Sequence, residues 1–163
     1  MSISTVSSRL IASRADLVGD RWSLNGTDEY PALSVVVGSD AIPFDVRHDT
    51  QAAPPADVRF VGWARDDFDW VVSCLGGEVP ALGSRLGEIR ERLASTTPGH
   101  WECYLESAGG LGGGNVITMS GSDADLYLFL DGRAAPDAEW QFVALLHEEL
   151  PAILEAAEAN ASD

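Results

Sequence analysis

One short segment combines residue types that could bind a metal ion. His100, Glu102 and Cys103 are nearly consecutive, and imidazole, carboxylate and thiolate groups are all zinc ligands. The segment reads as a strand, in which successive side chains point to opposite faces, so Cys103 would face away from His100 and Glu102. His147 lies on an expected helix but lacks a second histidine four residues later. We therefore predict no metal site and no cofactor.

Catalytic chemistry has few candidates. The chain contains no lysine, which excludes a Walker A loop and a Schiff-base lysine. The glycine-rich segment Ala108–Asn115 lacks the Lys-Ser/Thr ending of a phosphate loop, so we interpret it as a hairpin loop. No nucleophile motif surrounds Cys74 or Cys103, which we expect to be reduced and buried. We predict that the protein is not an enzyme.

Large aromatic side chains follow one face of a helix expected over residues 57–75. Arg59, Trp63, Asp66 and Trp70 recur at i, i+4, i+7 and i+11. These positions lie more than about 90° from the apolar face of the same helix. Tryptophan and arginine are enriched at the hot spots of protein interfaces. The face either binds a partner or packs between two parts of the molecule.

The helix that carries this face has a second copy later in the chain. Residues from Asp57 onward align without a gap with residues from Glu139 onward, at an offset of 82. Apolar residues coincide at helical spacing: Phe60, Ala64, Phe68, Val71 and Leu75 match Phe142, Leu146, Leu150, Ile153 and Ala157. Asp66 corresponds to Glu148, which therefore joins the predicted partner-binding residues.

Each copy also has a weaker helical stripe upstream, then a tryptophan and short β-like runs. Trp22 and Trp101 occupy corresponding places. The strand-like runs are Leu33–Val37, Ala41–Val46, Trp101–Leu105, Asn115–Met119 and Asp125–Leu130, and the linkers into the closing helices are Ala52–Ala56 and Ala134–Pro136. Gly38–Asp40 and Gly121–Asp123 are matching candidates for hairpin turns.

These patterns predict an α+β fold built from two tandem units, each with a helix, antiparallel strands and a second helix. The units cover residues 1–78 and 79–163. Because a unit of this size buries little surface alone, we expect them to share one compact domain with pseudo-twofold symmetry, as in a fused homodimer. Trp22 and Trp101 could then line a groove between the units.

The charge distribution restricts the partners. The formal net charge is −16, and residues 102–163 contain twelve acidic residues and one arginine. Such a field repels nucleic acid and anionic membranes and attracts basic proteins. No apolar run is long enough to span a bilayer, and no signal-peptide pattern occurs near Met1, so we expect a cytoplasmic protein. The sequence leaves open whether it is a monomer or a dimer.

Three segments resemble a pattern in uncharacterised proteins of high-GC actinobacteria and their phages, which runs "ATPGPW", then "DAxFIAxA", then "DxPxLL". The matching segments are residues 89–102, residues 137–144 and residues 149–154. His100 replaces the usual proline and Glu149 the usual aspartate. The resemblance covers the second unit only. It implies an accessory or phage-related origin and brings no known activity.

The leading hypothesis is a non-catalytic protein that binds or inhibits a basic protein partner, in the manner of immunity or phage counter-defence proteins. One alternative is a DNA mimic that inhibits a nucleic-acid-binding protein, although Arg85, Arg90 and Arg92 interrupt the acidic character of one helix. Another alternative is a small-ligand binder or enzyme with a site between the two units.

Overall fold

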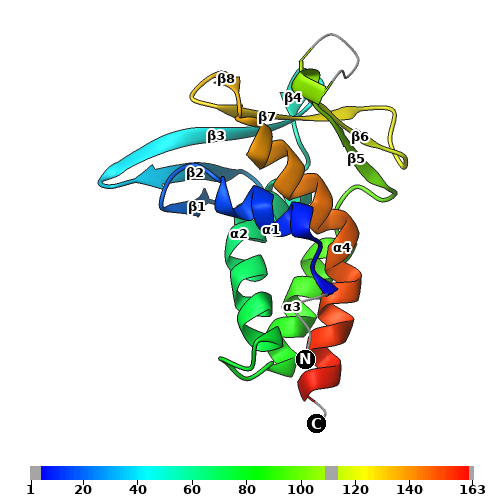
Figure 1. Cartoon of the computed structure of the whole chain (residues 1–163). Coiled ribbons are helices and arrows are strands. Elements are labelled where there is room, and N and C mark those ends of the chain that lie inside the picture. Colours follow the sequence, from blue (N-terminus) through cyan, green and yellow to red (C-terminus); the bar gives the residue numbers. More distant parts are fainter. Residues whose placement is uncertain (1–4, 109–113, 162–163) are drawn as a thin grey trace.

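The computed structural model describes residues 5–108 and 114–161, which form an α+β fold with helices packed against an antiparallel sheet (Figure 1). The predicted α+β class is confirmed. The α-helices of these residues are α1 (Ser8–Ala15), α2 (Pro55–Leu75), α3 (Gly83–Ala94) and α4 (Asp137–Ala161). The strands are β1 (Arg21–Gly26), β2 (Pro31–Val37), β3 (Asp40–His48), β4 (Gln51–Ala52), β5 (Trp101–Tyr104), β6 (Val116–Met119), β7 (Asp125–Leu130) and β8 (Arg133–Ala134), and a short 3-10 turn, η2 (Glu106–Ala108), follows β5.

The strands of the described residues form one sheet with the order β1-β2-β3-β7-β6-β5. The short strand β4 pairs with β3, and β8 pairs with β7. The central strands β3 and β7 are antiparallel, with Val46 opposite Leu128. The first half of the chain (residues 1–78) thus contributes β1, β2 and β3 on one side of the sheet, and the second half (residues 79–163) contributes β7, β6 and β5 on the other.

The core lies between one face of the sheet and the helices. Strand residues alternate between faces, so Val35 and Leu126 are fully buried while their neighbours Ser34 and Tyr127 are half-buried. Helices α2 and α4 extend away from the sheet with α3 beside them, and α1 crosses α4 (Figure 1). Among the described residues, no helix is both long and apolar enough to cross a membrane.

Two tight reversals lead the chain from the sheet into α2 and α4. Asp49 and Asp131 have positive φ angles of 54° and 53°, in a region that aspartate tolerates better than most residues. The Asp49 N–H donates to the Asp125 carbonyl over 2.9 Å, and the Asp131 N–H donates to the Pro43 carbonyl over 2.9 Å. After each reversal the chain pairs with the strand that precedes it, β4 with β3 and β8 with β7.

Several segments differ from the sequence-based expectations. Arg21–Gly26 was not predicted as a strand because its sequence has little β-propensity, but it pairs with β2 along its whole length. Ala52 and Ala134 were predicted as linker residues, and this is wrong because the two reversals place them in β4 and β8. Most of the glycine-rich segment lies outside the described residues.

Candidate functional site

The tryptophans predicted to form a face on α2 lie against α3, and an arginine covers each ring. The guanidinium carbon of Arg92 lies 4.8 Å from the centre of the Trp63 ring, and that of Arg85 lies 4.5 Å from the Trp70 ring. Cation–π contacts contribute about 0.5–1 kcal/mol at exposed sites. Trp70 is half-buried, whereas Trp63 remains 40% exposed. Both rings therefore help to hold α3, and Trp63 also presents an open aromatic surface.

The other two residues of the predicted face differ in their surroundings. The Nη1 of Arg59 donates to the Asp28 carbonyl over 2.6 Å, which ties α2 to the β1–β2 turn. The Asp66 carboxylate is exposed and accepts no hydrogen bond within the described residues. Trp63 and Asp66 are therefore the members of this face that are most available to a partner.

An ion pair beneath this face was missed by the sequence reasoning. The Nη2 of Arg92 donates to both carboxylate oxygens of Asp67, over 2.9 and 3.0 Å. Asp67 is 4% exposed, and burial raises the pKa of its carboxyl while Arg92 opposes that shift. Successive residues lie about 100° apart around a helix, and here that rotation leaves Asp66 exposed while Asp67 faces α3.

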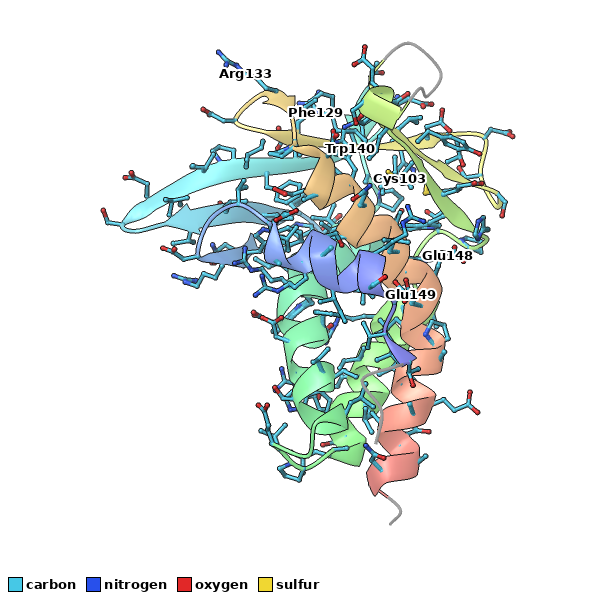
Figure 2. All side chains as sticks on the ribbon, in the orientation of Figure 1. Cys103, Phe129, Arg133, Trp140, Glu148 and Glu149 are labelled. Atoms are coloured by element: carbon cyan, nitrogen blue, oxygen red, sulfur yellow. The ribbon has the colours of Figure 1, made fainter. Side chains whose placement is uncertain are left out.

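Glu148 does not join the face on α2. It lies on α4 beside β5 (Figure 2). Its Oε1 accepts the backbone N–H of Trp101 over 2.6 Å, and its Oε2 lies 2.7 Å from Nδ1 of His100. Both oxygens are therefore engaged in fixing the start of an edge strand.

Trp22 and Trp101 are core residues, so the predicted groove between the two halves is filled at both positions. They are 3% and 1% exposed. Trp22 meets Phe142 edge-on with ring centres 5.9 Å apart, and Trp101 meets Phe60 edge-on at 5.7 Å. Large rings gain most when their apolar area is removed from water. Trp101 also contributes to the lining of a cavity of about 430 Å³ beside β5.

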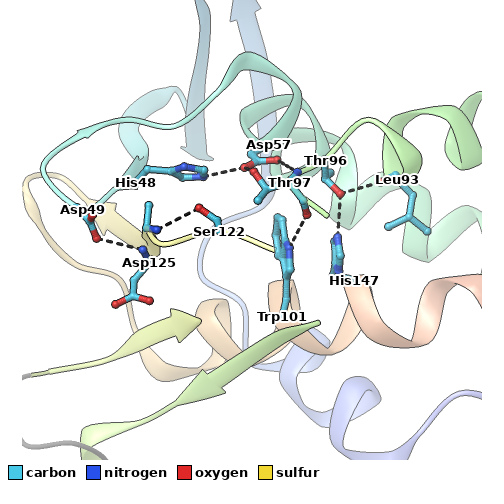
Figure 3. Close-up of polar contacts among 11 residues, drawn as sticks. His48, Asp49, Asp57, Leu93, Thr96, Thr97, Trp101, Ser122, Asp125 and His147 are labelled. Carbon is cyan, nitrogen blue, oxygen red and sulfur yellow. Dashed lines mark hydrogen bonds and ion pairs between the residues drawn. The ribbon is translucent and has the colours of Figure 1, made fainter. Parts of the chain in front are cut away.

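A buried polar network joins α2 to the segment before β5 (Figure 3). The Asp57 carboxylate is fully buried and accepts from the Thr97 N–H over 2.7 Å and from the Thr97 hydroxyl over 2.7 Å. Its Oδ2 also lies 2.8 Å from Nε2 of His48. A buried carboxylate is tolerated when its oxygens have such partners. The network thus connects the first half of the chain to the second.

The neighbouring Thr96–His147 pair has the residue types of a nucleophile and a base, but its hydrogen bonds run the wrong way for that role. The Thr96 hydroxyl donates to the Leu93 carbonyl over 2.7 Å, so it accepts from Nε2 of His147 at 2.8 Å (Figure 3). Burial lowers the pKa of His147 to about 4, and the ring stacks on Trp101 with centres 3.8 Å apart. The pair therefore positions the chain before β5.

A second fully buried carboxylate lies at the start of α4. Oε2 of Glu139 accepts weakly from the Val18 N–H at 3.5 Å, and its Oε1 has no partner. Burial raises the pKa of Glu139 to about 7. Nearby, Arg65 donates to the carbonyls of Val18, Gly19 and Asp20 over 2.9–3.1 Å. These contacts fix the segment before β1.

The residues considered for a metal site lie close together only in part. Nε2 of His100 and Oε2 of Glu102 are 3.9 Å apart. Within the described ranges, no group of three or more His, Cys, Asp or Glu side chains is arranged to hold a metal ion. Burial raises the pKa of the Cys103 thiol to about 11, which keeps it protonated and unreactive at neutral pH. Burial also raises the pKa of the Cys74 thiol.

The surface charge is carried by carboxylates because most arginines are engaged within the molecule. Seven of the ten arginines contact carboxylates, carbonyls or aromatic rings: Arg14, Arg47, Arg59, Arg65, Arg85, Arg90 and Arg92. Several exposed carboxylates accept no hydrogen bond and form no ion pair within the described residues: Asp16, Asp40, Glu88, Glu91, Asp123, Asp131 and Glu155. The field at the surface is therefore strongly negative.

Comparison of the chain with protein-family models, curated proteins and solved structures finds no match. The resemblance to actinobacterial and phage proteins therefore stays a prediction.

Proposed function

We propose that this protein is a non-catalytic binding protein that recognises and inhibits a basic protein partner. The observation that carries the proposal is the contrast between exposed, unpaired carboxylates and arginines that are engaged internally. A basic partner gains these attractions without breaking the internal ion pairs. Complementary charge of this kind speeds association and selects against acidic partners.

The α2–α3 face, made of Arg59, Trp63, Asp66 and Trp70 with the α3 residues beside them, would supply the apolar anchor. Trp63 is 40% exposed, and tryptophan is among the residues that contribute most to binding energy. Next to it lies a hollow of about 220 Å³ whose charged lining is mixed, with Glu88 and Glu91 beside Arg59 and Arg92. The part of the ring that Arg92 leaves open suits the apolar stem of a partner side chain, and Glu88 and Glu91, which are unpaired within the described residues, can accept its charge.

The non-catalytic part of the proposal is supported by the state of the candidate nucleophiles. The Thr96 hydroxyl directs its proton to the Leu93 carbonyl and away from His147. The Cys103 thiol stays protonated because its pKa is about 11. Neither group is activated as a nucleophile requires.

We also propose that the two halves arose by tandem duplication and pack as a fused dimer. At the offset of 82, Val46 corresponds to Leu128, and these two residues face each other in the central strand pair. A twofold axis through that pair accounts for this register. The positive φ angles of Asp49 and Asp131 lie at the same offset.

Ring contacts across the two halves support the same proposal. Trp22 from the first half meets Phe142 of the second, and Trp101 from the second half meets Phe60 of the first. Phe60 and Phe142 are 82 residues apart, and both ring pairs are edge-on at nearly equal distances. Reciprocal contacts of this kind are typical of an isologous interface.

Affinity capture from host lysate tests the proposal, with identification of the captured protein by mass spectrometry and calorimetry on the purified pair. We expect a basic protein whose affinity falls steeply as salt is raised. Trp63→Ala should weaken binding at least about tenfold, as truncation of a hot-spot tryptophan does. Ile11→Ala is the matched control, because Ile11 is 44% exposed on α1.

Two results would change the conclusion. A captured nucleic-acid-binding protein that duplex DNA displaces would favour the DNA-mimic alternative. Capture of only acidic partners, with affinities that do not depend on salt, would overturn the proposal for a basic partner.

A further inference from the structure

A cleft of about 1040 Å³, lined by the first half of the chain except for Ala124, opens between β2, β3 and the connection from β4 to α2. We refer to it as the β2–β4 cleft. Its walls include Ser34 on β2, Asp45 on β3, Ala52 on β4 and Val58 on α2. The cleft does not include the residues of the α2–α3 face.

The corresponding region of the second half is bridged by its own chain. There the Ser107 hydroxyl and the Asn115 amide, from the β5–β6 connection, donate to Asp137 at the start of α4 over 2.6 and 2.9 Å. Pro55 stands 82 residues before Asp137 and has no side-chain acceptor. In the first half, the β1–β2 connection spans only Thr27–Tyr30 and is shorter than the β5–β6 connection of the second half. The chain therefore leaves the start of α2 uncovered.

Side-chain size adds to the opening. In the second half, Trp140 packs edge-on against Tyr127 with ring centres 6.3 Å apart. The residues 82 positions earlier are Val58 and Asp45, and both line the cleft. Two large rings are thus replaced by smaller side chains, which leaves a space that a second chain segment can enter.

The chemistry of the lining favours a positively charged occupant. Glu29, Asp45 and Asp49 line the cleft, and no arginine does. Asp45 lies 3.5 Å from Arg47, but both side chains are nearly half exposed, so this pair is weak. Tyr30, at the rim, is 76% exposed and offers an aromatic face to a cation.

We propose that the β2–β4 cleft binds an extended, arginine-rich segment of the basic partner, an inference that rests on the proposed function and assigns it a docking site. The partner segment takes the place that Ser107 and Asn115 occupy beside the start of α4 in the second half. Its guanidinium groups pair with Glu29, with Asp49, whose Oδ1 also accepts the Asp125 N–H, and with Asp45 in place of the weak contact to Arg47. Its apolar stems lie along the prolines of the lining, such as Pro43 and Pro54.

A fluorescein-labelled oligo-arginine peptide is the probe, and anisotropy at low salt measures its affinity. Ala52→Trp introduces a bulky side chain into the cleft and should weaken binding about tenfold or more by steric exclusion. Ala134→Trp is the matched control, because Ala134 is an exposed residue at the equivalent place in β8 and does not line the cleft. We expect the control to bind as the wild type does.

Charge variants test independently whether the carboxylates of the cleft contribute to the affinity for the peptide. The double variant Asp45→Asn/Asp49→Asn should weaken binding roughly three- to tenfold, if each exposed pair contributes up to about 1 kcal/mol. Asp40→Asn/Asp131→Asn removes the same charge outside the cleft and keeps an Asp→Asn change at a positive φ. An oligo-glutamate peptide of equal length should not bind.

Amide chemical shifts then separate the two proposals. Shifts concentrated on cleft residues, together with selective loss in Ala52→Trp, would support the docking site. Oligo-arginine binding that both tryptophan variants retain equally would overturn the cleft while leaving a basic-partner function in place. If oligo-arginine does not bind the wild type, the docking site is refuted, and lysate capture decides the proposed function separately.

Discussion

Two buried carboxylates at the starts of α2 and α4 have unequal partners. Asp57 has donors at 2.7 Å from both the N–H and the hydroxyl of Thr97, and His48 lies at 2.8 Å. Glu139 is also fully buried, but its Oε1 has no partner and its Oε2 has only a 3.5 Å contact. Burial without compensation favours the protonated acid, and this is why the pKa of Glu139 rises to about 7.

We predict that Glu139→Gln stabilises the protein at neutral and alkaline pH. The ordinary pKa of Glu139 is 4.5, and its folded-state pKa is about 7. As the pH rises from 4.5 to 7, the unfolded chain loses this proton while the folded protein keeps it, so the free energy of unfolding falls. The variant has no proton to lose at this position, so its free energy of unfolding does not fall for this reason. The difference in free energy of unfolding, variant minus wild type, should therefore be about 1–3 kcal/mol larger at pH 8 than at pH 4.

Urea unfolding followed by tryptophan fluorescence at several pH values measures this difference. His147 acts in the opposite direction, because its depressed pKa of about 4 removes stability as the pH falls. Its contribution is common to both proteins and cancels in the comparison. Glu155→Gln, an exposed site on the same helix, is the control. A stability difference that stays constant with pH would contradict the role assigned to Glu139.

At the scale of elements, arginine side chains of α3 attach this helix to α2 through an ion pair and cation–π contacts. Arg92 pairs with Asp67 and covers Trp63, and Arg85 covers Trp70. The buried apolar residues on α3 are Leu86 and Ile89. A helix with so little buried surface depends on its polar contacts more than α2 or α4 does.

We predict that Asp67→Asn destabilises the protein by about 1–3 kcal/mol, because Arg92 then lacks its charged partner beneath the Trp63 ring. Asp66→Asn is the matched control and should stay within about 0.5 kcal/mol of the wild type, since Asp66 is exposed. Urea unfolding measures both, and hydrogen exchange in residues 83–94 should increase selectively in Asp67→Asn. Equal changes in the free energy of unfolding for the two variants would rule out the Asp67–Arg92 ion pair as the contact that stabilises α3 on α2.

The sequence predicted the long helices and most of the larger strands, but not all elements. Periodic apolar residues such as Phe60, Phe68 and Leu146 specify the helices, because helical spacing brings them to one face. β1 was missed because its pairing with β2 is a tertiary effect. β4 and β8 were missed because they depend on positive φ angles at Asp49 and Asp131, which the sequence pattern did not indicate.

The candidate site was predicted less well than the fold, because side-chain partners depend on contacts distant in sequence. Helical spacing placed Trp63 and Trp70 together on α2, but the arginines that cover them come from α3. Trp22 and Trp101 were assigned to a groove, whereas the packing of the two halves buries them. A single periodicity cannot distinguish an exposed ring from one that a second element covers.

At the scale of the whole molecule, the two halves share their core, so neither should fold alone. The β3–β7 pair and the reciprocal tryptophan–phenylalanine contacts all cross between them. An isolated half would expose the central edge of its sheet and lose the partner rings, and domains of this size already bury too little surface. The α2–α3 connection contains the exposed residues 76–80, where the chain can be divided without breaking a helix or strand.

We therefore predict that fragments 1–78 and 79–163 are each largely unfolded and regain the native fold when mixed. Two-dimensional amide NMR spectra of the separate and mixed fragments measure this, with circular dichroism at several concentrations to follow assembly. Val46→Asp in the first fragment should abolish reassembly, because Val46 is 5% exposed in the central pair. Val37→Asp is the control, since Val37 is 43% exposed at the end of β2. A first fragment that folds alone as a monomer would show that the halves are independent and would contradict the shared core.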